Sequence, residues 1–457
     1  MAVDLNEMRA RLTEWIGKKM PRARDISLSE LQKPGMGLSS ETYLFDIGWK
    51  EDGREKSKSV VLRSAPREHK VFPEYEIGHQ FRIMQILKEN TDVPVAKMLW
   101  LEEDPAVIGA PFFLMEKLEG DVPQDYPSYH GSGMYFEATP DQRTKMWWGA
   151  LEAMVKVHKL DWKKLKLGFL GESRNPADSV DRQLAYWDRF FNWMKDNPKE
   201  SHPTMEATLA WLKKNRYSPE RMTLCWGDSR IGNTLFSRPN RDVVAVMDWE
   251  MAYIGDPEGD LAWFFMLDKQ HSKGYGLPRL SGTPEDAEVV RRYEALTGWK
   301  AKNLLYNEVL ATFRYGLTVI SVLKKFRKQG IPIEDDLILN NFPTQHLAHL
   351  LGLPAPGVKK PEIKRIEETK AVVQFHFTGP GGSDWYLVSD RGKASRHEGM
   401  AKNPDCTIKV SIDDWKAIRR GELNQLDAWS SGRLVTDGDL GLLTLLKEMI
   451  DEATRNI

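Results

Sequence analysis

Residues 224–236 read Leu-Cys-Trp-Gly-Asp228-Ser-Arg-Ile-Gly-Asn233-Thr-Leu-Phe, and residues 243–249 read Val-Val-Ala-Val-Met-Asp248-Trp. A carboxylate, an amide five residues later and a second carboxylate after the next predicted strand have the spacing of a phosphoryl-transfer centre. The spacing therefore predicts Asp228 as the catalytic base, because such a centre must hold its hydroxyl nucleophile in line. Asn233 and Asp248 are predicted ligands of Mg²⁺, which prefers hard oxygen donors. The structural alternative is that Asp228 caps a turn and Asp248 caps a strand end.

The sequence before this motif predicts a helix followed by a strand-rich lobe. Residues 1–25 have the spacing of an amphipathic helix rather than of a signal peptide, with Met8, Leu12, Trp15 and Ile16 on its apolar face. The lobe spans residues 26–119. Its predicted elements are strands at 38–47, 59–63, 98–102 and 111–115, a polar tip at 48–59, and a helix with Ile77, Phe81, Met84 and Leu87 on one face.

Three parts of this lobe could contact a nucleotide. Gly35-Met-Gly37-Leu-Ser39-Ser40 lies between two predicted strands, where glycines allow close backbone approach to phosphates and the serines offer donors. An ordinary hairpin turn is the alternative. Arg63, at the end of the next strand, is placed to reach the phosphates, or else is a solvated strand residue. The backbone of Glu116 and Leu118 would bind adenine, a prediction that rests on position alone.

A helical lobe follows at residues 120–351, interrupted by the motif as a strand-and-loop island. Helices are predicted at 181–195, 205–214 and 306–329. His158 lies on an apolar helical face and is expected to be a hydrogen-bonded core histidine. Asp256 and Asp260 are expected to accept backbone amides rather than to catalyse.

The segment 352–361 contains three prolines and two glycines, which predicts a linker. The remaining residues, 362–457, suffice for a small α+β domain. Strands are predicted at 371–378, 384–389 and 406–411, and helices at 414–420, 425–431 and 440–453.

Composition narrows the possible partners. With 457 residues and a formal net charge of -1, the chain has room for more than one core and no overall field for nucleic acid. The longest apolar run, residues 261–267, is too short to cross a bilayer. Only two cysteines occur, and Cys225 is expected to pack rather than react. A cytoplasmic protein without a nucleic-acid partner is the simplest expectation.

The segment from about residue 31 to 351 resembles the aminoglycoside-phosphotransferase family of small-molecule kinases, in particular the subgroup found fused to certain acyl-CoA dehydrogenases. The matching residues are Gly37-Leu-Ser-Ser-Glu-Thr-Tyr43, Val61-Leu62-Arg63, Pro111-Phe-Phe-Leu-Met-Glu116, Val157-His158-Lys-Leu-Asp161, Trp226-Gly-Asp-Ser-Arg-Ile-Gly-Asn233 and Met247-Asp248-Trp-Glu. The resemblance implies an α+β, bilobal protein-kinase-like fold. It also implies ATP and Mg²⁺ as cofactors and a hydroxyl group as acceptor.

The chain departs from this family pattern at three positions. Arg63 stands where the family has a lysine, and Gln80 stands where the helical glutamate partner of that lysine is expected, although Glu76 lies one turn earlier. An arginine is always charged and forked, so it can clamp phosphates without that partner. Trp226 stands where many members have histidine, which affects packing beside the loop.

The tail from about residue 362 resembles a sterol carrier protein type 2 domain. The matching residues are Phe375-His-Phe-Thr-Gly379, Asp384-Trp-Tyr-Leu-Val388, Asn403-Pro-Asp-Cys-Thr-Ile408, Asp414-Trp-Lys-Ala-Ile-Arg-Arg-Gly421 and Gly432-Arg-Leu-Val-Thr-Asp-Gly438-Asp. The resemblance implies a sheet covered by helices, with an apolar tunnel for a fatty acyl or sterol ligand. The aliphatic stripe that could line this tunnel, or form a plain core helix, is Leu442, Leu445, Leu446, Met449 and Ile450.

The combined interpretation is an ATP- and Mg²⁺-dependent phosphotransferase that acts on a hydroxyl of a small, lipid-like substrate such as a hydroxyacyl-CoA. One alternative is a catalytically weak nucleotide- and lipid-binding regulatory protein, motivated by Arg63 and Gln80. A second is an antibiotic phosphotransferase, disfavoured because no acidic cluster for a polycation appears near the end of the helical lobe. A protein kinase is disfavoured because the His-Arg-Asp, Asp-Phe-Gly and Ala-Pro-Glu motifs are missing from the sequence.

Overall fold

The computed structural model describes residues 4–33, 40–67, 70–171, 175–331, 333–354, 356, 370–420, 423, 428, 433–438 and 446–454. The chain divides into two compact units. The first unit comprises Met1–Arg327 and Pro332–Gly357, and the second comprises Lys328–Ile331 and Val358–Ile457. Across the described residues, no helix is both long enough and apolar enough to span a bilayer.

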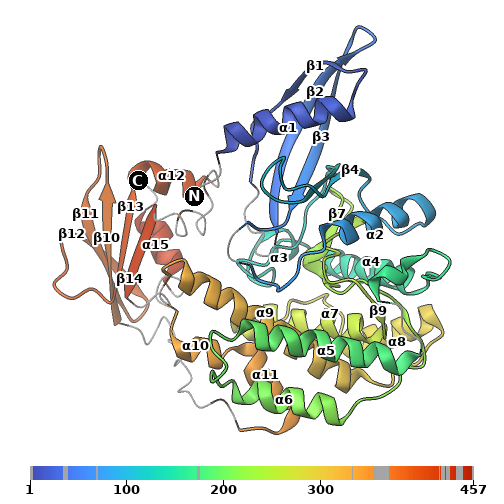
Figure 1. Ribbon diagram of the computed structural model, residues 1–457. Coiled ribbons are helices and arrows are strands. Elements are labelled where there is room, and N and C mark those ends of the chain that lie inside the picture. The colour runs from blue at the N-terminus through green and yellow to red at the C-terminus, as the bar shows by residue number, and fades with distance from the viewer. Residues whose placement is uncertain are drawn as a thin grey trace. The chain divides into compact units, whose positions relative to one another are not determined.

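The first unit begins with an antiparallel sheet of order β1-β2-β3-β5-β4 (Figure 1). Its strands are β1 (Arg24–Leu28), β2 (Glu41–Glu51), β3 (Arg54–Ser64), β4 (Met98–Glu102) and β5 (Phe112–Glu116). Helix α1 (Leu5–Lys19) buries its predicted apolar face against residues of β2, β3 and β5. Helix α2 (Ile77–Asn90) packs beside β4 and β5. The predicted helices and strands of this lobe are thus present.

The predicted polar tip at residues 48–59 is wrong, because both strands continue through it. Strands β2 and β3 stay paired as far as Glu51 and Arg54, and only Asp52 and Gly53 form the turn. Both turn residues have positive φ, 51° and 73°. This backbone is that of a two-residue hairpin turn whose twist matches the strands, and Asp-Gly is one of its preferred sequences. The sequence pattern does not reveal these ends of the strands, because their charged side chains face solvent and show no apolar alternation.

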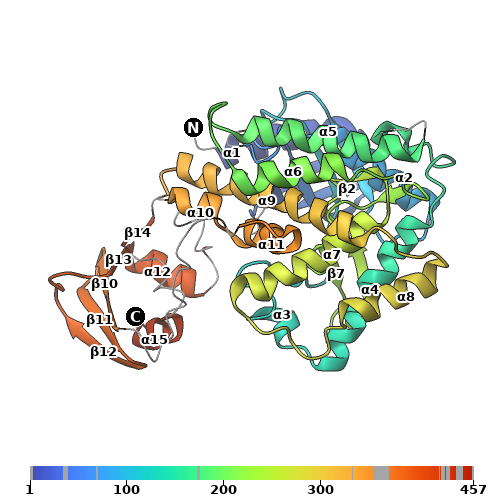
Figure 2. The same cartoon turned by 90° about the horizontal axis from the view of Figure 1, so that it is seen from below.

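Helices dominate the rest of the first unit, shown from below in Figure 2. They are α3 (Gly133–Phe136), α4 (Pro140–His158), α5 (Pro176–Met194), α6 (Pro203–Lys214), α7 (Glu258–His271), α8 (Asp286–Thr297), α9 (Leu304–Lys328), α10 (Asp335–Leu339) and α11 (Phe342–Leu351). Among them, short strands pair as β6 (Thr223–Cys225) with β9 (Tyr253–Gly255), and β7 (Thr234–Phe236) with β8 (Val243–Val246). The order of a strand-rich lobe followed by a helical lobe, and with it the predicted α+β fold class, is confirmed.

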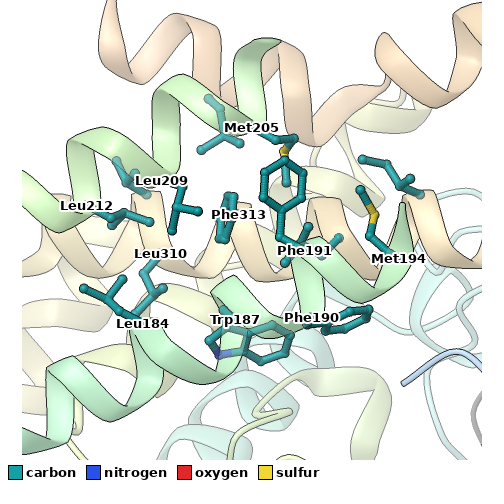
Figure 3. Close-up of a cluster of buried hydrophobic side chains, with 14 of the residues drawn as sticks. Leu184, Trp187, Phe190, Phe191, Met194, Met205, Leu209, Leu212, Leu310 and Phe313 are labelled. Carbon is teal, nitrogen blue, oxygen red and sulfur yellow. The ribbon is translucent and has the colours of Figure 1, made fainter. Parts of the chain in front are cut away.

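Helices α5, α6 and α9 share one hydrophobic core (Figure 3). Phe191 of α5, Leu209 of α6 and Phe313 of α9 lie together in it, and Trp187 of α5 lies beside Phe190 in the same cluster. Phe313 is fully buried. This core adjoins the start of the motif, because α5 also packs against β9, which pairs with β6 just before Asp228.

Replacing Phe313 with alanine is expected to lower the free energy of unfolding by about 3–5 kcal/mol, because the change removes a buried ring and leaves a cavity. Urea denaturation followed by circular dichroism measures this loss. Leu305→Ala on the same helix is the control, since that side chain is 56% exposed. Equal effects of the two changes would contradict the assignment of Phe313 to the core.

The second unit contains a five-stranded sheet of order β12-β11-β10-β13-β14. Its elements are β10 (Lys370–Thr378), β11 (Asp384–Asp390), β12 (Lys393–Glu398), β13 (Cys406–Ser411), α12 (Ile412–Arg419), β14 (Leu434–Gly438) and α15 (Lys447–Ala453). Strands β10 and β13 are parallel, and the other pairs are antiparallel. Strand β12 was not predicted, because all six of its residues are exposed and show no alternation.

The predicted aliphatic stripe lies partly within the described residues. Leu446 and Ile450 are buried in a cluster with Phe375 and Trp385, and Met449 packs against that cluster. Leu442 and Leu445, like most of the helix predicted at 425–431, lie outside the described residues. The described part of the stripe belongs to the core of this unit.

Candidate active site

The β7–β8 hairpin brings the two predicted metal ligands together. Thr234 pairs with Val246, so residues just before β7 and just after β8 meet at one end of the hairpin. The Met247 amide donates to the Asn233 carbonyl at 2.9 Å. Asp248 follows directly with a φ of 60°, a left-handed backbone that aspartate tolerates better than most residues. Asn233 and Asp248 therefore lie at the same end of this hairpin.

Asp228 is held by three donors. Its Oδ1 accepts a hydrogen bond from Trp263 Nε1 of α7 at 2.8 Å, and its Oδ2 accepts one from Asn233 Nδ2 at 2.7 Å. Arg230 Nε lies 3.2 Å from Oδ1. The side chain remains 14% exposed. These contacts fix the carboxylate while a face of it stays accessible.

The environment of Asp228 shifts its proton affinity. Burial raises the pKa of the Asp228 carboxyl above its ordinary value, because the charged form loses solvation. The Arg230 guanidinium opposes this rise, and the Asp248 carboxylate adds to it. Two carboxylates are thus close enough to repel each other, an arrangement that a divalent cation would relieve.

The loop before Asp228 rests on Asp260. The amides of Trp226 and Gly227 donate to its two carboxylate oxygens at 2.6 and 2.8 Å. His158 Nε2 lies 3.0 Å from the same carboxylate, and its Nδ1 lies 3.0 Å from the Tyr293 hydroxyl. The predictions for His158 and Asp260 are confirmed.

Gly227 has no room for a side chain. Its φ is 89°, and a Cβ there would fall well inside van der Waals contact of the Met251 carbonyl oxygen. The Gly227 carbonyl in turn accepts from Arg314 of α9 at 2.9 Å. The backbone just before Asp228 is therefore constrained by Met251 at the Gly227 Cα and by Arg314 at the Gly227 carbonyl.

Neighbouring residues confirm two further expectations. Asp256 accepts the Glu258 amide at 3.0 Å and hydrogen bonds from Tyr217 and Asn307. Cys225 is fully buried, and burial raises the pKa of its thiol well above the ordinary value. Asp256 thus accepts a backbone amide as expected, and Cys225 is packed in the core.

Trp226 links the loop of Asp228 to the loop of Asp248. Its indole Nε1 donates to the Met247 carbonyl at 2.7 Å. Its ring also lies 6.1 Å from that of Trp249, and both rings are buried. The residue that replaces the family histidine thus has a structural function between the two loops.

Arg63 of β3 reaches this group from the sheet. Its Nη2 lies 3.2 Å from Asp248 Oδ1 and 3.8 Å from Glu250 Oε2. Arg63 Nε is buried and, among the described residues, has no acceptor. Arg63 therefore lies beside Asp248, and its predicted binding of phosphates stays a prediction.

The other predicted nucleotide contacts are described only in part. Gly35, Gly37 and Ser39 lie outside the described residues. Ser40 is buried and donates through Oγ to Glu250 Oε2 at 3.1 Å. In the connector, the Glu116 amide donates to the Lys97 carbonyl at 2.9 Å. The nucleotide-binding functions of Ser40, Glu116 and Leu118 stay predictions.

The donors around Asp248 fit a magnesium ion. Both hydrogen bonds from Asn233 use its amide nitrogen, donating to the carbonyl and Oδ2 of Asp228, so these bonds do not engage its oxygen. Asp248 contributes a carboxylate 22% exposed. Oxygen donors from one or two side chains are what Mg²⁺ usually takes from a protein. Asn233 and Asp248 are thus suited to hold it.

Three residues of this site were not predicted to act there. Trp263 and Arg230 both contact Asp228, and Glu250 contacts Arg63. Arg230 also forms an ion pair with Asp125. Arg230 and Glu250 lie within the quoted motifs, but spacing alone does not reveal where an arginine or a glutamate points.

The antiparallel sheet, the helical lobe and the strand-loop-hairpin that carries Asp228, Asn233 and Asp248 define a protein-kinase-like phosphotransferase fold. Comparison with protein families agrees, since the phosphotransferase enzyme family matches residues 30–301. The chain belongs to this family. Residues 349–451 match the SCP-2 sterol transfer family, which confirms the predicted second domain.

Several known proteins are similar to this chain. Acyl-CoA dehydrogenase family member 10 of Mus musculus is 31% identical over 51% of this chain and 20% of its own length. A probable acyl-CoA dehydrogenase of Arabidopsis thaliana, IBR3, is 28% identical over 61% of this chain and 34% of its own length. The chain thus spans only a fifth to a third of these relatives.

Among the solved structures that resemble this chain is one with the same fold. It is provisionally described as an aminoglycoside phosphotransferase of Ralstonia eutropha JMP134, with a TM-score of 0.55 and 23% identity. The similarity covers 75% of this chain and 98% of that one.

Proposed function

We propose that this protein transfers the γ-phosphoryl group of ATP to a hydroxyl of a small, lipid-like acceptor, with a hydroxyacyl-CoA as the leading candidate. The observation that carries this proposal is the arrangement of Asp228, held by Trp263, Asn233 and Arg230 beside Asp248. An accessible carboxylate in a rigid frame suits the positioning of a hydroxyl nucleophile.

Asp228 would orient the acceptor hydroxyl and accept its proton. In the transfer, the acceptor oxygen bonds to the γ-phosphorus, the bond from that phosphorus to the β-phosphate bridging oxygen breaks, and ADP departs. The raised pKa of Asp228 favours acceptance of the proton at this stage. Asn233 and Asp248 would hold Mg²⁺, which neutralises phosphate charge when bound. Arg63 would bind phosphate oxygens from the side of the sheet.

The proposed class of acceptor rests on the second domain of this chain and on the names of its relatives. The same chain carries a domain of the SCP-2 sterol transfer family, and its similar relatives are named as acyl-CoA dehydrogenases. An acyl or sterol ligand is the common chemistry that these names suggest. A lipid-like acceptor therefore fits better than a polycationic antibiotic.

A transfer assay tests this proposal. Purified protein, Mg²⁺ and γ-labelled ATP are incubated with hydroxyacyl-CoAs, hydroxy-lipids or aminoglycosides, and labelled product is counted. We expect transfer to a hydroxyacyl-CoA or hydroxy-lipid to exceed transfer to any aminoglycoside. If wild type and Asp228→Ala both bind ATP but transfer equally little, the regulatory nucleotide-binding alternative is favoured instead.

The pH dependence of kcat/KM should reflect the raised pKa of Asp228. The active form is the deprotonated carboxylate, so kcat/KM is expected to fall as pH decreases through this pKa. Since burial raises the pKa, the midpoint should lie above the ordinary aspartate value of about 3.9. Initial rates at constant ionic strength locate it. A midpoint at or below about pH 4 would contradict a general-base function for Asp228.

A further inference from the structure

Glu250 contacts Ser40 and Arg63, two residues that the sequence predicts to bind the nucleotide. It lies two residues after Asp248, and its side chain is only 10% exposed. Its Oε2 accepts the Ser40 hydroxyl at 3.1 Å and lies 3.8 Å from Arg63 Nη2. Ser40 is the first described residue after the glycine-containing segment. One carboxylate oxygen thus connects Ser40, strand β3 and the loop of Asp248.

Helix α2 does not supply the carboxylate partner of Arg63. Gln80 is uncharged and buried, and Glu76 is 66% exposed and lies 4.0 Å from His79. Within the described part of the chain, the ion pairs of Arg63 are with Asp248 and Glu250 alone. The partner expected on a helix is therefore replaced by a carboxylate from the opposite lobe.

Arg63 and Mg²⁺ need the same carboxylate. Arg63 Nη2 is nearer to Asp248, at 3.2 Å, than to Glu250, at 3.8 Å. A cation bound at Asp248 would have to compete with this guanidinium, which cannot be neutralised by deprotonation. The carboxylate of Glu250 lowers the free-energy cost of breaking the ion pair between Arg63 and Asp248. With Glu250 beside it, the buried guanidinium of Arg63 still has an anionic partner.

We infer that Glu250 is a positioning residue, which keeps an ion pair with Arg63 when Asp248 binds the metal ion. This inference rests on the proposed function, in which Asp248 holds Mg²⁺ and Arg63 binds phosphate. Glu250 acts on the metal only through Arg63 and is not itself a ligand. The same carboxylate also accepts the hydroxyl of Ser40.

Binding of ATP at graded Mg²⁺ concentrations, measured by titration calorimetry, tests this inference without relying on turnover. In Glu250→Gln, the Mg²⁺ concentration for half-maximal enhancement of ATP binding is expected to rise about tenfold, the size of a typical coupling between contacting charges. In the Arg63→Met background, adding Glu250→Gln should change it less than twofold. Glu76→Gln, a glutamate of the same lobe as Arg63, should behave as wild type.

The comparison of backgrounds decides the inference. An equal tenfold rise with and without Arg63 would overturn it, since Glu250 would then act on the metal directly. Unchanged Mg²⁺ dependence in Glu250→Gln would also overturn it. If wild type binds no ATP with Mg²⁺, the proposed function itself fails. Thermal melting of each variant, with Glu250→Asp as a second variant, separates loss of folding from loss of coupling.

Discussion

Replacing Asp228 with asparagine is expected to lower the rate of phosphoryl transfer by about 10²- to 10⁴-fold, the usual contribution of a positioned acid or base. The amide keeps the size of the carboxylate but cannot accept the hydroxyl proton. Trp263 can still donate to its oxygen, so the loop should keep its shape. The affinity for ATP is expected to stay within about threefold of wild type, because the Asp228 side chain is proposed to contact the acceptor and not the nucleotide.

Single-turnover rates with the best acceptor of the transfer assay measure this effect. Asp242→Asn is the matched control, since that carboxylate is 58% exposed and pairs with Lys145 at the surface. The control should keep the wild-type rate. A rate in Asp228→Asn within about threefold of wild type would exclude Asp228 as the base.

Replacing Asp260 with alanine is expected to lower the free energy of unfolding by about 3–5 kcal/mol, as when a buried ionic partner is removed. The Asp260 side chain is fully buried, and the change leaves two backbone amides and His158 without their acceptor. Buried donors without partners each cost desolvation energy. The same change should displace Gly227 and Asp228 and so reduce transfer in the protein that remains folded.

Urea denaturation gives the stability difference, and transfer per folded molecule gives the catalytic one. Asp181→Ala serves as control, because its ion pair with Arg216 is half exposed and surface pairs contribute about 0–1 kcal/mol. A loss below about 1 kcal/mol in Asp260→Ala would mean that water replaces the carboxylate. In that case Asp260 would not be the support of the catalytic loop.

The fold could be predicted from the sequence wherever apolar residues follow a clear period. Helix α1 buries the four residues of its predicted face, and α9 ends within one residue of its predicted end. The hairpin of β2 and β3 extends further than predicted, because exposed Lys, Glu and Arg residues give no alternation. The cue that was available there is Asp52-Gly53, which is a turn signal in its own right.

The sequence allowed the residues of the candidate site to be predicted, but not which of them contact one another. The spacing of Asp228, Asn233 and Asp248 reflects a local strand-loop-hairpin, so the sequence contains it. The partners of Arg63 come from residues about 185 positions later, and no local pattern records such a contact. Which carboxylate meets Arg63 depends on how the two lobes pack.

The hydrogen bond from Trp226 to the Met247 carbonyl has a mechanical consequence. Because this bond and the buried Trp226 and Trp249 rings join the two loops, we expect Asp228, Asn233 and Asp248 to move together as one rigid group. An opening motion that admits a nucleotide would have to bend elsewhere, and the connector after β5 is the covalent link between the lobes. The distance from Asp228 to Asp248 should therefore stay constant through a catalytic cycle while the distance from Arg63 to both changes.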